Sequence, residues 1–135
     1  MTEEQDNHVQ QEINRAINFL GQNKFLEAEN TCLKIIDSGD NADAYHILSS
    51  IKIYQQEFED SIKYVKKSIA INDDNPGYHV TLGCAYSAKE DYESSIIAFK
   101  SAIKINNKIA QVHFYLGESY SCLLYTSDAA DEHGC

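Results

Sequence analysis

Apolar side chains recur along the chain at helical spacing and at a fixed long period. Phe25, Phe58 and Tyr92 follow one another at nearly equal intervals, and each opens a segment of the same kind. A small residue follows three positions later in each segment, at Ala28, Ser61 and Ser95. Bulkier apolar residues come four positions after that, at Cys32, Val65 and Phe99. The pattern predicts amphipathic helices that repeat about every 34 residues.

The segments before these helices repeat with the same period. Leu48, Leu82 and Leu116 follow one another at that interval. Each leucine is followed by a small residue, at Ser49, Gly83 and Gly117. We expect a second helix to cross the first closely at the small residue, while the leucine fills the space between the two helices. Because one helical hairpin cannot bury its own apolar stripe, neighbouring hairpins should stack into one core.

Turn-forming residues set the expected helix limits. Asn75 is suited to cap a helix that has Pro76 in its first position. First helices are expected near residues 10–22, 43–55, 77–89 and 111–123. Second helices are expected near residues 25–38, 58–71 and 92–105. The first of these segments is amphipathic but departs from the repeat pattern, as expected for an N-terminal cap.

Taken together, these residues resemble the tetratricopeptide repeat (TPR), which has a period of about 34 residues. The strongest match is Leu82-Gly83-x-x-Tyr86, followed by Asp91-Tyr92-x-x-Ser95-x-x-x-Phe99-x-x-Ala102. The resemblance covers residues 9–121 and implies an all-α fold, a right-handed α-solenoid of antiparallel helix pairs with about 3.5 repeats. The expected array, residues 1–121, has units at about 9–41, 42–75, 76–109 and 110–121, the last one partial.

The end of the chain does not continue the repeat. Residues 122–132 have no aromatic-x-x-small start for a further helix. Residues 122–132 resemble the in-frame translation of a sequencing-library adapter over eleven consecutive residues. We therefore interpret residues 122–135 as a non-native tail on an N-terminal fragment; a genuine short polar tail is the alternative. The fourth hairpin would then lack its second helix, so this end is expected to fray or self-associate.

Charge narrows the classes of partner. The 135 residues carry 21 acidic and 11 basic side chains, a net charge of -10. Sequence-independent binding to nucleic acid or to an anionic membrane requires a cationic surface, so neither is an expected partner. The chain has no signal-peptide pattern, and no apolar stretch reaches the ~20 residues that span a bilayer. Cys32 and Cys84 are expected to be reduced core thiols of a cytoplasmic protein.

The sequence contains no pattern that predicts catalysis, a cofactor or a metal site. Paired-cysteine zinc spacing, a phosphate-binding glycine loop and a nucleophile elbow are all missing. His79 and His113 are one repeat apart, so they should lie on successive helices, roughly 10 Å from each other, and pack between helices. Lys63, Lys66 and Lys67 form the one basic cluster, expected on a solvated outer face. We therefore expect no enzyme activity within this chain.

In TPR arrays the first helices line a concave groove that takes extended or helical peptides. The resemblance places thirteen residues in that groove: Asp43, His46, Ile47, Ser50, Tyr54, Val80, Thr81, Cys84, Ser87, Gln111, Phe114, Tyr115 and Glu118. This lining is mixed and aromatic rather than basic. TPR domains that clamp the terminal carboxylate of heat-shock chaperones use lysine, arginine and asparagine at places occupied here by Ile13, Ile17, Ile47, Gly77 and Thr81. The resemblance therefore argues against that partner.

Two functions remain open. The stretch from Phe25 to Leu48 resembles the opening repeats of bacterial proteins in which a TPR array precedes a glycosyltransferase or sulfotransferase domain. The chain is therefore expected to be a protein–protein interaction scaffold, or the N-terminal docking region of a larger bacterial enzyme. The asparagine ladder of TPR arrays in O-linked N-acetylglucosamine transferases is missing, with Ile47, Thr81 and Tyr115 in its place. Fold alone does not decide between the two functions.

Overall fold

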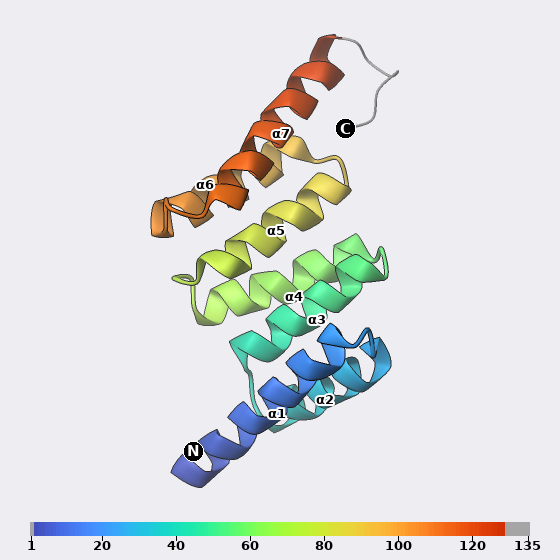
Figure 1. Cartoon of the computed structure of the whole chain (residues 1–135), viewed down its shortest axis with the longest axis vertical. Helices are drawn as coiled ribbons and strands as arrows, with labels where there is room; N and C mark the ends of the chain where they lie inside the picture. The colour runs from blue at the N-terminus through green and yellow to red at the C-terminus, as the bar shows by residue number, and fades with distance from the viewer. Residues whose placement is uncertain (1, 129–135) are drawn as a thin grey trace. The chain divides into compact units, whose positions relative to one another are not determined.

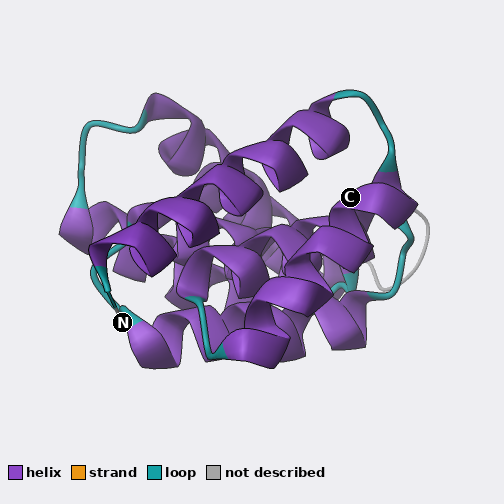
Figure 2. Ribbon diagram, turned by 90° about the horizontal axis from the view of Figure 1, so that it is seen from below, coloured by secondary structure: helices purple, strands orange, loops and turns teal. Residues whose placement is uncertain are grey.

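The computed structural model describes residues 2–128, in which seven α-helices and no strand occur (Figures 1 and 2). The helices are α1 (Glu3–Gly21), α2 (Phe25–Ser38), α3 (Ala42–Tyr54), α4 (Phe58–Ile71), α5 (Pro76–Ala88), α6 (Tyr92–Ile105) and α7 (Ala110–Asp128). The predicted all-α fold of helix pairs is confirmed. All three second helices have the predicted bounds, and α3, α5 and α7 each begin one residue before the predicted start.

The two ends of the helical region differ from the prediction. Helix α1 begins at Glu3 because Thr2 caps it: the Gln5 N–H donates to Thr2 Oγ1 at 3.3 Å, and the Thr2 N–H donates to Gln5 Oε1 at 3.0 Å. This reciprocal pair is a capping box. Helix α7 continues to Asp128 rather than ending near residue 123. Residues 129–135 of the predicted non-native tail lie outside the described residues.

The turn inside each helix pair has the same backbone geometry. Asn23, Gln56 and Glu90 have φ of 59°, 60° and 65°, the left-handed region, although none of them is glycine. The next N–H in each turn donates back to a carbonyl of the first helix, from Lys24 to Phe19 at 2.8 Å, Glu57 to Lys52 at 2.8 Å and Asp91 to Tyr86 at 2.9 Å. This is the Schellman arrangement that ends helices. Three copies of one turn fix the pairing of α1 with α2, α3 with α4 and α5 with α6.

Asparagine caps open α3 and α5, and the predicted Asn75 cap is confirmed. The side-chain oxygen of Asn41 accepts the Ala44 N–H at 3.0 Å. Asn75 accepts the Gly77 N–H at 2.9 Å, and Pro76 stands in the first turn of α5. A cap of this kind satisfies a backbone donor that the helix itself leaves unpaired.

The chain divides into two compact units, Met1–Asn72 and Asp73–Cys135. In the first unit α1 packs on α2 and α3 on α4, while α2 and α3 also touch. Ile13, Cys32 and Leu48 belong to its buried core. Serine side chains make two hydrogen bonds between α3 and α4. Ser49 Oγ of α3 donates to the Ser61 carbonyl of α4 at 2.8 Å, and Ser68 Oγ of α4 donates to the Ala42 carbonyl of α3 at 2.7 Å. Serine can replace alanine in this crossing because its hydroxyl is satisfied.

In the second unit α6 packs against both α5 and α7. The predicted close crossing at Gly83 is confirmed, because a Cβ atom there would stand 2.5 Å from Cε1 of Phe99. Phe99 is the largest fully buried side chain among the described residues, and it forms a buried cluster with Ala102 and Val112. On the α7 side, Ser95 Oγ donates to Ser119 Oγ at 2.9 Å in a buried position.

Candidate functional site

The first unit contributes predicted site residues from α3. Asp43 and Tyr54 are exposed, and His46 and Ser50 are partly buried. Tyr54 stacks on Phe25 with ring centroids 5.3 Å apart and still exposes 67% of its surface. Ile47 differs from these neighbours, since it is 5% exposed and belongs to the core cluster of the unit. The side chain of Ile47 thus supports the α3 surface and does not line it.

His46 has an environment that favours its neutral form. Burial lowers the pKa of His46, and the charge of Asp43 opposes part of that shift. The Ser50 hydroxyl donates to the His46 carbonyl at 3.2 Å, one turn back along α3. At neutral pH the imidazole can therefore both donate and accept hydrogen bonds without adding positive charge to this surface.

The second unit brings several predicted residues together around Phe99. Val80 and Cys84 of α5 and Tyr115 of α7 all pack against the core cluster that contains Phe99. The Phe99 and Tyr115 rings are 5.7 Å apart, and the Gln111 amide donates to the Tyr115 hydroxyl at 2.7 Å. Burial raises the pKa of Cys84 to about 11, and the charge of Glu118 adds to this. Cys84 is therefore an unreactive thiol at neutral pH, as is Cys32, whose pKa burial raises to about 12 with help from the charge of Glu29.

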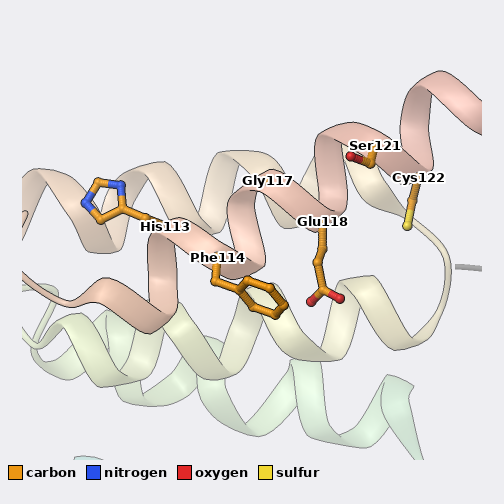
Figure 3. A pocket seen from close by; sticks show the side chains of 6 residues that line it. All are labelled: His113, Phe114, Gly117, Glu118, Ser121 and Cys122. Carbon is orange, nitrogen blue, oxygen red and sulfur yellow. The ribbon is translucent and has the colours of Figure 1, made fainter.

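Helix α7 carries a depression on a face that no described helix covers. The depression has a volume of about 510 Å³ and is lined by His113, Phe114, Gly117, Glu118, Ser121 and Cys122. Figure 3 shows Phe114 and Glu118, one helical turn apart, pointing to the same side of α7. Phe114 exposes 63% of its surface. Of these lining residues, the sequence predicted Phe114 and Glu118 as site residues; the others could have been found from their position on the same helix face.

Gly117 has the repeat register of Gly83 but different surroundings within the described residues. The repeat spacing places a crossing helix at this position, whereas the interpretation of residues 122–135 as a non-native tail leaves the fourth hairpin without its second helix. A Cβ atom built on Gly117 meets nothing within 4 Å, and the residue is exposed. The repeat therefore retains the small residue at this position, although the described part of the chain places nothing over it.

The two repeat-related histidines contact the turns before their helices. His79 Nε2 is 3.0 Å from the Asp73 carbonyl, and His113 Nε2 is 2.9 Å from the Asn107 carbonyl. The expectation that both imidazoles pack between helices is wrong for His113, which is exposed. Each ring instead holds the turn six residues before it. Within residues 2–128, no group of three His, Cys, Asp or Glu side chains could hold a metal ion.

The first helices of the later pairs carry very little charge. Helix α5 has no charged residue, and residues 110–125 of α7 have only Glu118. The single lysine of α3, Lys52, is 14% exposed and pairs with Glu29 at 3.2 Å and Glu57 at 3.4 Å. These three helices therefore present polar, aromatic and acidic groups. Across the described residues, every helix is too short or too polar to span a membrane.

Comparison with protein families identifies one model, described as Tetratricopeptide repeat, at residues 42–75 and 76–109. The two matches cover half of the 135 residues and coincide with α3–α4 and α5–α6. No curated protein sequence matches the chain.

Solved structures show the same fold at low sequence identity. The TPR domain of Sgt2 from Aspergillus fumigatus matches 95% of this chain over 87% of its own, with a TM-score of 0.85 and 9% identity. The second TPR domain of human RPAP3, in complex with the HSP70 peptide SGPTIEEVD, matches 81% of this chain over 92% of its own, with a TM-score of 0.75 and 15% identity. An O-GlcNAc transferase mutant from Thermobaculum terrenum matches 95% of this chain with a TM-score of 0.84 and 19% identity, and the match spans 24% of the transferase chain.

Proposed function

Because the chain belongs to the tetratricopeptide repeat family, we propose that it is a protein-interaction module that binds a peptide or partner protein on the surfaces of its first helices. In the first unit the proposed surface is formed by Asp43, His46, Ser50 and Tyr54, with Ile47 beneath it. In the second unit it is formed by Val80, Thr81, Cys84, Ser87, Gln111, Phe114, Tyr115 and Glu118. The observation that carries the proposal is the exposure of Tyr54 and Phe114, at 67% and 63%, on helices that are otherwise nearly uncharged.

Exposed aromatic rings on a rigid helix are suited to binding. They offer a large apolar area with little loss of side-chain freedom, and aromatic residues frequently contribute most to binding energy at interfaces. Tyr54 is held by its stacking on Phe25, and Phe114 lies 6.2 Å from the Tyr115 ring. Both rings are therefore positioned before any partner arrives.

The charge of these helices favours a partner with apolar, aromatic or cationic groups. The RPAP3 domain binds a peptide that ends in Glu-Glu-Val-Asp, and a strongly acidic ligand of that kind needs cationic side chains around it. Here α5 has no charged residue, and Lys52 is already engaged by two glutamates. We therefore expect this chain not to bind an acidic peptide of that type.

A peptide library displayed on phage and selected against the protein tests the proposal. Selected peptides should bind Phe114→Ala or Tyr54→Ala about tenfold more weakly than the unmodified protein, because truncating a central aromatic ring removes about 1–2 kcal/mol or more of binding energy. Lys66→Ala, on the exposed surface of α4, is the matched control and should leave binding unchanged. The peptide SGPTIEEVD should not bind. Equal losses in all three variants would exclude the first-helix surfaces as the binding site.

A second function is favoured by one observation. The match to the O-GlcNAc transferase covers nearly all of this chain but only 24% of the enzyme, as expected if such repeats can form one part of a larger catalytic protein. In that case the chain would be the docking region of a larger bacterial enzyme. Reading the genomic sequence through and beyond residue 121 separates the two functions. A downstream transferase domain would favour the enzyme, and further repeat units followed by a stop codon would favour the scaffold.

A further inference from the structure

The outer face of α2 carries two exposed leucines. Leu26 and Leu33 are two helical turns apart and lie on one stripe of the helix. They expose 67% and 40% of their surface. This exposure remains although α1 and α3 both pack against other sides of α2. The leucine stripe is therefore a surface of the first unit whose neighbouring helices are already in place.

The repeat does not require leucine on this stripe. The equivalent positions of α4 and α6 hold exposed charged residues: Glu59, Lys66, Glu93 and Lys100. A charged side chain is thus compatible with the helix packing at both places. Adjacent exposed leucines on one stripe are a candidate contact surface, because apolar groups gain free energy when a partner removes them from water.

The stripe is also hollowed beside Leu33. A depression of about 500 Å³ is lined by Asn30, Leu33, Lys34, Ile36 and Asp37. Positions 30, 33, 34 and 37 form the four-residue hole that receives one side chain of a facing helix in knobs-into-holes packing. Leu26, the more exposed of the two leucines, is the side chain that projects as a knob. Helix α2 therefore presents one knob and one hole on the same face.

A knob and a hole on one face match a second copy of the same helix that runs antiparallel. When Leu26 of one copy enters the hole of the other, two-fold symmetry places Leu26 of the second copy in the hole of the first. Each Leu26 then contacts the Leu33 of the other copy. A helix of a different protein would have to supply a matching knob and hole, whereas α2 already contains both.

The charges beside the stripe are complementary in the same arrangement. Glu27 of one copy comes near Lys34 of the other, and Lys24 comes near Asp37. All four side chains are exposed, and none of them belongs to an ion pair within residues 2–128. Two acids and two bases make this contact area neutral, although each chain has a net charge of -10. Charges elsewhere on the two copies are screened beyond about 8 Å at physiological salt.

We propose that the outer face of α2 binds a second copy of this chain, with the two α2 helices antiparallel about a two-fold axis. Leu26 and Leu33 supply the apolar contact, and the pairs of Glu27 with Lys34 select the antiparallel register. Helix α2 has 14 residues, so the contact is smaller than the roughly 1,200 Å² of a stable complex. The dimer should therefore be weak, with a dissociation constant on the order of 100 μM.

Sedimentation velocity of the full chain between about 10 μM and 1 mM tests the proposal. The unmodified protein should change from monomer to dimer across this range. The double variant Leu26→Ser with Leu33→Ser should associate at least about tenfold more weakly, because both apolar contacts are lost. Ile97→Ser is the matched control: it replaces a side chain of α6 that is 69% exposed, and it should associate as the unmodified protein does.

Charge reversal tests the orientation of the two helices. Lys34→Glu and Glu27→Lys should each weaken self-association by about tenfold, since each sets like charges together at both symmetric positions. An equimolar mixture of these two variants should recover the association of the unmodified protein, because every opposing pair then has opposite signs. Lys63→Glu, the same kind of change on the exposed surface of α4, is the control and should have no effect.

Three results would overturn the proposal. They are a monomer at every concentration, association that is unchanged when both leucines are replaced, or a mixture of the charge-reversed variants that associates no better than either variant alone. The second result would place the contact elsewhere, such as the end of α7. Circular dichroism verifies that each variant retains its helices. Failure here leaves the proposed peptide binding intact, because that depends on Tyr54 and Phe114 of the first helices.

Discussion

The α3–α4 and α5–α6 pairs have the same turn geometry and the same repeat positions, yet their closest contacts use different chemistry. In α3–α4, Ser49 faces α4 and hydrogen bonds to Ser61. In α5–α6, Gly83 lies beneath the ring of Phe99, while the residue equivalent to Phe99 in α4 is the smaller Val65. A larger residue on one helix is thus matched by a smaller one on the other, so the crossing depends on the combined volume of the two positions.

The largest loss of stability is expected when the buried ring of Phe99 is removed. Phe99 is 1% exposed, and Phe99→Ala should lower the free energy of unfolding by about 3–5 kcal/mol. Val65→Ala, at the equivalent place in α4, removes fewer atoms and should cost about 2 kcal/mol. Urea unfolding followed by circular dichroism measures both. A larger loss for Val65→Ala would show that the ring is not the main support of the α5–α6 crossing.

Replacing Gly83 and Phe99 of α5–α6 by the serine and valine that occupy the equivalent positions of α3–α4 should lower the free energy of unfolding by an intermediate amount. Gly83→Ser alone should destabilise by about 1–3 kcal/mol, because the added side chain overlaps the position of Phe99. The double variant with Phe99→Val copies the Ser49 and Val65 combination, so it should be less destabilised than the sum of the single changes. A double-mutant cycle measures the coupling, which should be at least about 1 kcal/mol. Strictly additive losses would contradict the volume-matching account.

A third difference between the pairs lies on their first helices, where His46 of α3 corresponds to Val80 of α5. The folded-state pKa of His46 lies below its ordinary value of 6.5 because of burial, so the unfolded state binds its proton more readily. The contribution of His46 to the free energy of unfolding is therefore greatest above pH 6.5, and it declines as the pH falls below that value. The decline should be at most about 1.4 kcal/mol down to pH 5.5.

The variant His46→Val isolates this effect, because the remaining histidines are common to both proteins. The stability of the unmodified protein relative to that of His46→Val should decrease as the pH falls through the interval between 6.5 and 5.5. Parallel pH profiles for the two proteins, from urea unfolding in a series of buffers, would show that His46 is equally accessible in the folded and unfolded chain.

The sequence was sufficient to predict local features that repeat. The second helices begin at Phe25, Phe58 and Tyr92 as predicted, since the aromatic residue and the preceding turn recur together. The early start of α1 was missed because its cap depends on Thr2 and Gln5, outside the repeated pattern.

Features that depend on contacts between residues far apart in the sequence were harder to predict. The ion pair of Lys52 with Glu29 joins residues 23 positions apart, so no local pattern contains it. Ile47 and His46 are neighbours on α3, and a helix turns about 100° per residue, so the sequence could not fix which of them is buried. Periodicity assigns Gly83 and Gly117 the same register, but it carries no information on whether another helix lies over each of them.

The opposite surroundings of Gly83 and Gly117 can be measured with one substitution at each position. Gly83→Ala should lower the free energy of unfolding by about 1–3 kcal/mol, since its methyl group meets Phe99. Gly117→Ala should raise it by about 0.5–1 kcal/mol, since alanine favours a helix and its methyl group enters open space. Urea unfolding of the two variants beside the unmodified protein is the direct test. Opposite signs are predicted, and a loss of stability in both variants would contradict an open face on α7.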